Sequence, residues 1–450
     1  MIVSPAFSGK RYAVLGLARS GMATAEALLA SGARVTVWDR REGPRDELAG
    51  RAEIGDPLVI DLAGFDGVAL SPGVPLNTHP IAARAHDAGV PLIGDIELFA
   101  QARPQLPPHK VVGITGTNGK STTTALVHHL LVQAGIPAMM GGNIGLPILA
   151  QDPLPAGGVY VLELSSYQID LTFSLACDAA ALTNITPDHL DRYAGFDAYA
   201  GSKARLFAMQ DAGQFAVFGC DDPSTTAVQQ AEAARRAPGR SACADLARWA
   251  GSQAQWPSLQ GPHNLQNAAI AAAIVLELGL NEDQVLAGLA SFTGLPHRME
   301  RLGEYGGVLF VNDSKATNPA STAPALAAFP PRADGHRRIH WICGGLPKGD
   351  DLDECAPAFP NIAAAYTIGE AGPRFAELLE PVMPVERCEM MSEAVQRAIA
   401  AAQPGDVVLL SPACASFDQF RDYEVRGDNF RQLVVQLAGG GTANGEGRGA

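Results

Sequence analysis

The stretch that decides the fold is KVVGITGTNGKSTTT, residues 110–124. Its apolar start is typical of a buried strand, and its end runs into a helix-like segment. Between them lies a glycine-rich turn that ends in Gly119-Lys120-Ser121, although Ile114 stands where the usual pattern has glycine. Glycines let backbone N–H groups approach phosphates, a lysine supplies a point charge, and a serine hydroxyl can bind Mg²⁺. The segment therefore predicts a loop that binds a nucleoside triphosphate.

Length and composition narrow the class of protein. The chain has 450 residues, with 47 Asp or Glu against 33 Lys or Arg, and its net charge is −14. This acidic balance argues against nucleic acid or an anionic membrane surface as a partner, and no apolar stretch is long enough to span a bilayer. The seven cysteines are scattered without a CxxC pair, which predicts reduced thiols and neither a disulfide framework nor a zinc site. We expect a cytoplasmic, monomeric enzyme.

Short β-branched runs alternate with Ala- and Leu-rich stretches along the chain, the pattern of parallel sheets with crossover helices. The predicted fold is therefore α/β with three domains. The first and third are Rossmann-like, and the central one is P-loop ATPase-like with a mainly parallel sheet. The Pro-rich linker ARPQLPPHK and the segment TGLPHRME mark the boundaries. The predicted segments are 1–103, 104–298, 299–438 and a disordered tail over 439–450.

The first block begins with RYAVLGLARSGMATAEALLASGARVTVWD (11–39), which predicts a strand, a glycine turn, a helix and a second strand. Gly16, Ala18 and Gly21 stand where a dinucleotide-binding fold has its glycines, and Asp39 ends the second strand in a position to bind a ribose. Ala18 replaces the glycine that lets the backbone approach a pyrophosphate. Two interpretations stay open from these residues: an NAD(P) site, or a site for the diphosphate and ribose of a nucleotide sugar.

The second block carries polar residues after its strands. Glu163 interrupts the buried-strand pattern GVYVLELSS (158–166), where a carboxylate near the phosphate loop can supply a further Mg²⁺ ligand. The next apolar run leads into a loop with Asp188, His189 and Asp191. A metal ligand and a structural histidine are both compatible with this loop.

Other residues are ambiguous by themselves. Lys203 has the pattern of a solvated helix lysine, and Asn264 and Asn267 open a helix that they can cap instead of contacting a nucleotide. In the third block, apolar runs end in small polar residues at three places. Because ligands of open α/β sheets sit at the carboxyl ends of the strands, this repetition favours a binding site. The polar residues concerned include Asp313, Ser314, Lys315, Thr317 and Lys348.

Seven motifs, in order along the chain, resemble those of the Mur ligases. The resemblance covers essentially everything except the tail, and its last two motifs are typical of the members that add D-glutamate. It implies that the first block holds a nucleotide sugar rather than NAD(P). The motifs are GTNGKST (116–122), ELSSYQ (163–168), NITPDHLDRY (184–193), GPHNLQN (261–267), LPHR (295–298), NDSKATN (312–318) and LSPACASFDQF (410–420).

The resemblance also implies an activity, ATP-dependent amide-bond formation in peptidoglycan precursor synthesis. The γ-phosphoryl group of ATP would pass to the carboxylate of UDP-N-acetylmuramoyl-L-alanine, and D-glutamate would displace phosphate from the resulting acyl phosphate. ATP and two Mg²⁺ ions are the implied cofactors. A sister activity that adds L-glutamate or another amino acid is the alternative, because the residues do not decide the stereochemistry of the substrate.

The resemblance assigns roles by position in the motifs. ATP would be bound by Gly116, Thr117, Asn118, Gly119, Lys120, Ser121, Thr122, Asn264, Asn267, Arg298 and Asp313. The nucleotide sugar would be bound by Ser20, Asp39, Arg40, Asn143 and His189. The glutamate would be bound by Lys315, Thr317, Lys348, Ser416 and Tyr423, the last of which stands where phenylalanine is expected. The implied metal ligands are Ser121, Glu163, His189 and a carbamylated Lys203; the implied catalytic residues are Lys120, Glu163, His189 and Lys203.

Overall fold

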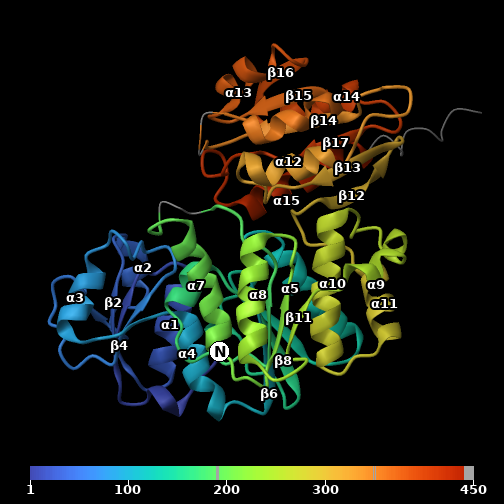
Figure 1. Ribbon diagram of the computed structural model, residues 1–450. Helices are drawn as coiled ribbons and strands as arrows, with labels where there is room; N and C mark the ends of the chain where they lie inside the picture. The colour runs from blue at the N-terminus through green and yellow to red at the C-terminus, as the bar shows by residue number, and fades with distance from the viewer. Residues whose placement is uncertain (189–191, 348, 350, 440–450) are drawn as a thin grey trace, which may run out of the picture. The chain divides into compact units, whose positions relative to one another are not determined.

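The computed structural model describes residues 1–188, 192–347, 349 and 351–439 (Figure 1). Three sheets of mainly parallel strands follow one another along the chain, with helices in the connections between strands. This confirms the predicted α/β class. The central strands are buried over most of their length, which is typical of parallel sheets covered by helices on both faces. None of the helices in the described part of the chain is long and apolar enough to cross a membrane.

The first sheet has the strand order β3-β2-β1-β4-β5, and its neighbouring strands are parallel. The turn after β1 is tight, since a Cβ on Gly21 would lie 1.8 Å from the carbonyl oxygen of Gly16. Only glycine lets the next helix begin this close to the strand. The elements are β1 (Arg11–Leu15), α1 (Arg19–Ala30), β2 (Arg34–Trp38), α2 (Glu42–Asp46), β3 (Glu53–Ile54), β4 (Gly67–Leu70), α3 (Ile81–Ala88), β5 (Leu92–Ile93) and α4 (Asp95–Ala102).

The second sheet has the order β11-β10-β9-β6-β8-β7, again with parallel neighbours. The register pairs Ile114 of β6 with Glu163 of β8, so that this carboxylate lies beside the end of the strand that carries the phosphate loop. The elements are β6 (His109–Thr115), α5 (Lys120–Gln133), β7 (Ala138–Gly142), β8 (Gly158–Glu163), α6 (Ser166–Asp170), β9 (Ala179–Leu182), α7 (Phe196–Ala208), β10 (Phe215–Phe218), α8 (Pro223–Arg235), β11 (Ser241–Cys243), α9 (Leu246–Ala250), α10 (Pro262–Glu277) and α11 (Glu282–Ser291).

The third sheet has the order β12-β13-β17-β14-β15-β16. Only β12 is antiparallel to its neighbour among these strands. Because β13, β17 and β14 are parallel and adjacent, the loops that follow them meet at one edge of the sheet. The elements are β12 (Glu300–Tyr305), β13 (Val308–Asn312), α12 (Pro319–Ala327), β14 (Ile339–Gly344), β15 (Ile362–Ile368), α13 (Gly372–Leu379), β16 (Val385–Glu389), α14 (Met391–Ala401), β17 (Val407–Leu410) and α15 (Tyr423–Leu437).

The chain divides into two compact units, Met1–Phe292 and the residues from Thr293 on. The first two sheets share one unit and a common apolar core. In that core the Phe99 ring of α4 packs edge-on against the Tyr160 ring of β8, with centroids 5.0 Å apart. The domain boundaries proposed from the sequence stay predictions, and the tail from residue 440 on lies outside the described residues.

The cysteines differ from expectation in one respect. Cys220 and Cys243 form a disulfide with their Cα atoms 5.7 Å apart, so the prediction of reduced thiols throughout is wrong for this pair. The two residues are brought together by the sheet, because the register places Cys243 of β11 opposite Phe218 of β10. No local spacing in the sequence reveals such a pairing. The other cysteines are free and buried: Cys177, Cys343, Cys355, Cys388 and Cys414.

Candidate active site

The loop after β6 has the conformation that its glycines allow. Gly116 and Gly119 have φ of 142° and 83°, values that favour glycine. Both positions are also crowded: a Cβ on Gly116 would lie 1.9 Å from Thr183 Oγ1, and one on Gly119 would lie 2.4 Å from Asn267 Oδ1. α5 then begins at Lys120 without a hydrogen bond from a capping side chain. Its first N–H groups can therefore bind phosphate oxygens.

The loop is held in place by the chain that follows β9. The Thr117 N–H donates to the carbonyl oxygen of Asn184 at 2.8 Å, and the Asn118 N–H donates to Asn184 Oδ1 at 2.9 Å. Ser121 is buried in the first turn of α5, and Thr122 is half-buried next to it. These two hydrogen bonds from backbone N–H groups hold the loop against the segment that follows β9.

Asn264 and Asn267 lie beside this loop, because α10 packs against α5. Thr123 Oγ1 of α5 donates to Asn267 Oδ1 at 3.3 Å, and Asn267 Nδ2 donates to Asn264 Oδ1 at 3.3 Å. α10 has Gly261 as its N-cap and no capping hydrogen bond from a side chain. The interpretation of these asparagines as helix caps is therefore wrong, and the structure brings both to the phosphate loop.

Two lysines bond to the loop backbone. Lys120 Nζ donates to the Thr117 carbonyl oxygen at 2.8 Å, and Lys203 Nζ of α7 donates to the Gly116 carbonyl oxygen at 2.8 Å. Lys203 is 2 % exposed, so it is not the solvated lysine that its own sequence context indicates. Its burial and the nearby charge of Lys120 lower the pKa of Lys203 to about 7. Sequence reasoning missed Tyr199, whose ring centroid lies 4.5 Å from Lys203 Nζ.

Glu163 is buried at the end of β8, and its two carboxylate oxygens differ in their hydrogen bonding. Its Oε1 accepts a hydrogen bond from Asn143 Nδ2 at 2.9 Å, whereas Oε2 is buried without a hydrogen-bond partner in the described structure. A buried carboxylate oxygen in this state is stabilised by a cation. Carboxylate and hydroxyl oxygens are ligands that Mg²⁺ prefers, so Glu163 with the Ser121 hydroxyl fits one such ion.

The residues fit a second Mg²⁺ less directly. The Lys203 Nζ donates to the Gly116 carbonyl oxygen and offers no oxygen ligand to Mg²⁺, whereas the carbamate that the family resemblance implies would. His189, the other implied ligand, lies outside the described residues. Within the described ranges, no group of three or more His, Cys, Asp or Glu side chains could hold a metal.

Cavities connect the phosphate loop with the first sheet. One cavity of about 340 Å³ is lined by both Lys120 and Lys203. A neighbouring cavity contains Ser20 and Asn143, two residues that the sequence predicts to bind a nucleotide sugar. The two cavities share Pro72 and Asn143 in their linings. The first is lined by Pro72, Gly73, Lys120, Asn143, Ser165, Ser166, Tyr167, Asp188, Tyr199 and Lys203.

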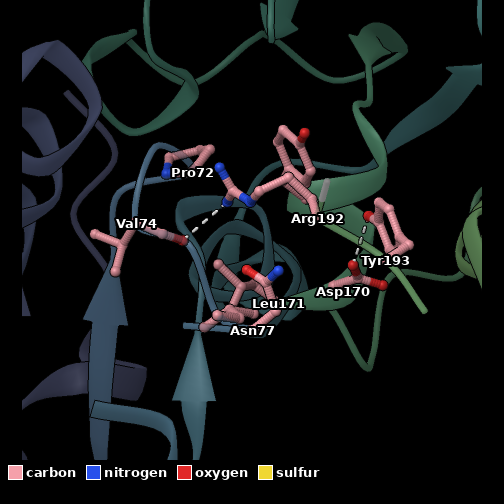
Figure 2. Close-up of a pocket in the computed structure, with 9 residues that line it drawn as sticks. Pro72, Val74, Asn77, Asp170, Leu171, Arg192 and Tyr193 are labelled. Carbon is pink, nitrogen blue, oxygen red and sulfur yellow. Dashed lines mark hydrogen bonds between the residues drawn. The ribbon is translucent and has the colours of Figure 1, made fainter. Parts of the chain in front are cut away.

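A third, smaller pocket adjoins these cavities and contains residues that sequence reasoning missed (Figure 2). Arg192 donates to the carbonyl oxygen of Val74 at 3.1 Å, and its guanidinium lies 4.2 Å from the ring centroid of Tyr167. Tyr193 OH donates to Asp170 Oδ2 at 2.8 Å. Arg192 and Tyr193 end the motif NITPDHLDRY, so the motif itself was the signal that could have identified them.

At the end of β2, Asp39 contacts the glycine turn of the first block. Its Oδ2 accepts a hydrogen bond from the Leu17 N–H at 2.7 Å, and its Oδ1 accepts from Arg41 Nε at 3.1 Å. Partial burial acts to raise the pKa of Asp39, but the hydrogen bonds from Arg41 and Leu17 outweigh it and lower the pKa to about 2. The structure therefore pairs Asp39 with Arg41. Arg40 and Arg41 are both exposed, and the role of Arg40 stays a prediction.

In the second unit, the predicted residues gather at the carboxyl edge of the third sheet. Asp313 is buried, and its Oδ2 accepts a hydrogen bond from Ser411 Oγ at 2.8 Å. Burial raises the pKa of Asp313 to about 7, although this bond opposes the effect. Lys315 Nζ lies 3.9 Å from the ring centroid of Tyr423, and Ser416 is buried nearby in the loop after β17.

The second unit contains three further residues that the sequence predicts to bind ATP or glutamate. Arg298 and Thr317 are half-buried in the second unit. Lys348, the remaining residue predicted for the glutamate, lies outside the described residues.

Comparison with protein families matches each of the three blocks. The Mur ligase MurD-like N-terminal domain matches residues 10–94, the Mur ligase middle domain matches residues 114–275, and the Mur ligase glutamate ligase domain matches residues 297–414.

Two curated relatives, both UDP-N-acetylmuramoylalanine–D-glutamate ligases, are similar over almost their whole length. The relative from Novosphingobium aromaticivorans is 69 % identical over 437 residues, with 97 % of each chain covered. The relative from Sphingopyxis alaskensis is 60 % identical, covering 97 % of this chain and 100 % of its own. Among solved structures, UDP-N-acetylmuramate-alanine ligase MurC from Thermotoga maritima shares the fold, with a TM-score of 0.58, 18 % identity and coverage of 95 % and 99 %. The chain belongs to the Mur ligase family.

Proposed function

We propose that this chain adds D-glutamate to UDP-N-acetylmuramoyl-L-alanine in an ATP-dependent reaction that releases ADP and phosphate. The observation that carries the proposal is the juxtaposition of a phosphate loop, two lysines and a half-satisfied carboxylate beside cavities lined by predicted nucleotide-sugar residues. The two relatives named above are D-glutamate ligases, which supports the choice of amino acid.

The first step transfers the γ-phosphoryl group of ATP to the carboxylate of the nucleotide-sugar substrate. A carboxylate and a phosphate are both anions, so their approach requires positive charge around the transferred group. Lys120 and the first N–H groups of α5 supply it, because both face the loop where the phosphates would lie. The amine of glutamate then attacks the acyl carbon, the new C–N bond forms, and phosphate leaves with the bonding pair of electrons.

Ser121 and Glu163 would hold one Mg²⁺, with His189 and the carbamate of Lys203 holding a second. When bound, these ions neutralise charge on the phosphates. The environment of Lys203 supports the proposed carbamate. With a pKa of about 7, a large fraction of the amine is neutral at physiological pH. The neutral amine can attack CO₂, forming an N–C bond and releasing a proton, so that a cation becomes an anionic oxygen ligand.

The second unit also carries residues predicted to bind substrates. Arg298 and Asp313 are those predicted for ATP. The incoming glutamate would be bound by residues that follow β13, β14 and β17, where two lysines and several hydroxyl groups can receive its carboxylates. These residues are Lys315, Thr317, Lys348, Ser416 and Tyr423.

We further propose that the enzyme acts as a cytoplasmic monomer on small-molecule substrates. The net charge of −14 disfavours nucleic acid and anionic lipid as partners. Sedimentation at several concentrations should give one species of 46.9 kDa; a concentration-dependent mass would refute the monomer.

The decisive test is phosphate release with ATP, Mg²⁺ and UDP-N-acetylmuramoyl-L-alanine, with D-glutamate, L-glutamate, L-lysine or meso-diaminopimelate added in turn. Turnover with D-glutamate alone is the expected result. Turnover with another amino acid instead would mean that the chain is a sister ligase with a different amino-acid substrate. Absence of turnover with all four would refute the ligase function.

Two variants test the proposed roles of the lysines. Lys120→Ala should abolish turnover without loss of the fold, because the charge on the phosphates is no longer balanced. Lys203→Ala should be nearly inactive but partly restored by formate, whose oxygens can replace those of the carbamate. Normal activity of either variant would contradict the role given to that lysine.

A further inference from the structure

Arg426, on the first turn of α15, is the largest charged side chain buried in the second unit. It is 1 % exposed, and no carboxylate oxygen of the described residues lies within ion-pair distance of it. Burial lowers the pKa of Arg426 to about 10, so the guanidinium stays charged at neutral pH. A buried cation without an ionic partner is costly and persists where its hydrogen bonds satisfy it.

The guanidinium donates to backbone and side-chain oxygens of two loops. Nε donates to Ser314 Oγ at 3.0 Å and Nη2 donates to the Ser314 carbonyl oxygen at 2.8 Å, both in the loop after β13. Nη2 also donates to the carbonyl oxygen of Cys414 at 3.0 Å, and Nη1 donates to that of Ala415 at 3.1 Å, both in the loop after β17. The planar fork of an arginine suits such divergent acceptors, which a lysine could not all reach.

A third loop packs against the same group. After β14, the Leu346 N–H donates to the Ala415 carbonyl oxygen at 2.9 Å, and the Ala415 N–H donates back to Leu346 at 3.0 Å. A Cβ on Gly345 would lie 3.0 Å from Arg426 Nη1. The three loops that meet at the carboxyl edge of the sheet are therefore joined through one guanidinium and the backbone groups around it.

Ser314 extends this contact to the predicted amino-acid residues. Its Oγ accepts from Arg426 and donates to the carbonyl oxygen of Tyr423 at 2.8 Å. Lys315, the next residue, has its ammonium over the Tyr423 ring, while Ser416 directly follows Ala415. Each of these predicted binding residues is thus adjacent in sequence, or bonded, to an acceptor of the guanidinium.

We propose that Arg426 is a positioning residue for the amino-acid substrate, one that fixes the loops after β13, β14 and β17 so that Lys315, Ser416 and Tyr423 converge on the incoming glutamate. The proposal rests on the function proposed above, which places the amino acid at these loops. It does not give Arg426 a contact with substrate.

The test compares steady-state kinetics of the wild type with Arg426→Ala and Arg426→Lys, varying D-glutamate, ATP and the nucleotide sugar separately. Loss of hydrogen bonds from a charged donor should raise the KM for D-glutamate by about tenfold or more. The KM for the nucleotide sugar should change by less than about twofold, because its predicted contacts do not depend on these hydrogen bonds. The lysine variant should lie between wild type and alanine, and guanidinium added at millimolar concentration should restore the alanine variant in part.

Two further variants separate positioning from stability. Leu379→Ala truncates a buried side chain of α13 in the same unit; it should lower the melting temperature but leave the KM for D-glutamate unchanged. Ser314→Ala removes only the hydroxyl between Arg426 and Tyr423 and should raise that KM even if the Arg426 variants do not fold.

An unchanged KM for D-glutamate in Ser314→Ala and in the folded Arg426 variants, with an active wild type, would overturn the positioning role alone. So would a parallel rise in the KM of Leu379→Ala. If the wild type showed no turnover with any of the amino acids, the proposed function would fail and this inference with it. If wild type used a different amino acid, the same comparison would be made with that substrate.

Discussion

Gly119→Ala tests whether the phosphate loop depends on glycine for its shape, for the space beside it, or for both. Gly119 has a φ of 83° and a Cβ there would lie 2.4 Å from Asn267 Oδ1. Gly135, just past the other end of α5, has a φ of 77° and nothing within 4 Å of its Cβ position. Gly135→Ala is therefore a matched control, which shares the backbone strain but not the clash.

The magnitudes follow from these two positions. A left-handed conformation costs an alanine about 1–2 kcal/mol, so both variants should lose about that much free energy of unfolding. In Gly119→Ala, Asn267 must also move by about 1 Å to reach an ordinary contact distance. That movement breaks its hydrogen bond with Thr123 and costs about 1 kcal/mol more. It also displaces a residue predicted to bind ATP, so we expect ATP affinity to fall by about tenfold or more, which corresponds to about 1.4 kcal/mol.

Chemical denaturation would measure the stability of both variants, and calorimetric titration with ATP and Mg²⁺ would measure affinity. The expected result is a loss of stability in both variants, larger by about 1 kcal/mol in Gly119→Ala, and a loss of ATP affinity in Gly119→Ala alone. Wild-type affinity in Gly119→Ala would refute the reasoning, and so would an equal loss of affinity in Gly135→Ala.

Three other predictions concern charge, pH and the disulfide. Glu163→Gln should weaken the Mg²⁺ dependence of turnover by about 10- to 100-fold without loss of stability, and an unchanged Mg²⁺ titration would exclude this carboxylate as a ligand. Because burial raises the pKa of Asp313 to about 7, the folded state keeps a proton that the unfolded chain releases near pH 3.8. Relative to Asp313→Asn, the wild-type free energy of unfolding should therefore fall as pH rises from about 4 to 7, by at most about 1.4 kcal/mol per pH unit; parallel pH profiles in denaturant titrations would contradict this. The disulfide between Cys220 and Cys243 closes a separation of 23 residues and should stabilise the chain by about 3 kcal/mol, so dithiothreitol should lower the melting temperature of the wild type but not of Cys243→Ser.

Local features of the sequence were enough to predict the class of fold and the position of the phosphate loop. The backbone angles that require glycine at positions 116 and 119 are properties of a few adjacent residues, whereas the close approach of Thr183 and Asn267 is a tertiary requirement. Alternating β-branched and helical stretches likewise indicate parallel sheets, because the period of side-chain burial is a local property. The motif order was sufficient to indicate the family, which the matching relatives confirm.

Tertiary structure decided the environment of single polar residues. Lys203 reads as a surface lysine in its helix, yet α7 places its ammonium against the Gly116 carbonyl oxygen, where burial changes its pKa. The order of the strands likewise decides which groups contact Glu163 and which two cysteines form the disulfide. Nothing in the sequence indicated a role for Arg426, because one of its acceptors, Ser314, lies 112 residues away along the chain. Chain geometry restricts what residues close in sequence can do, whereas burial, charge and hydrogen-bond partners arise only when distant segments pack together.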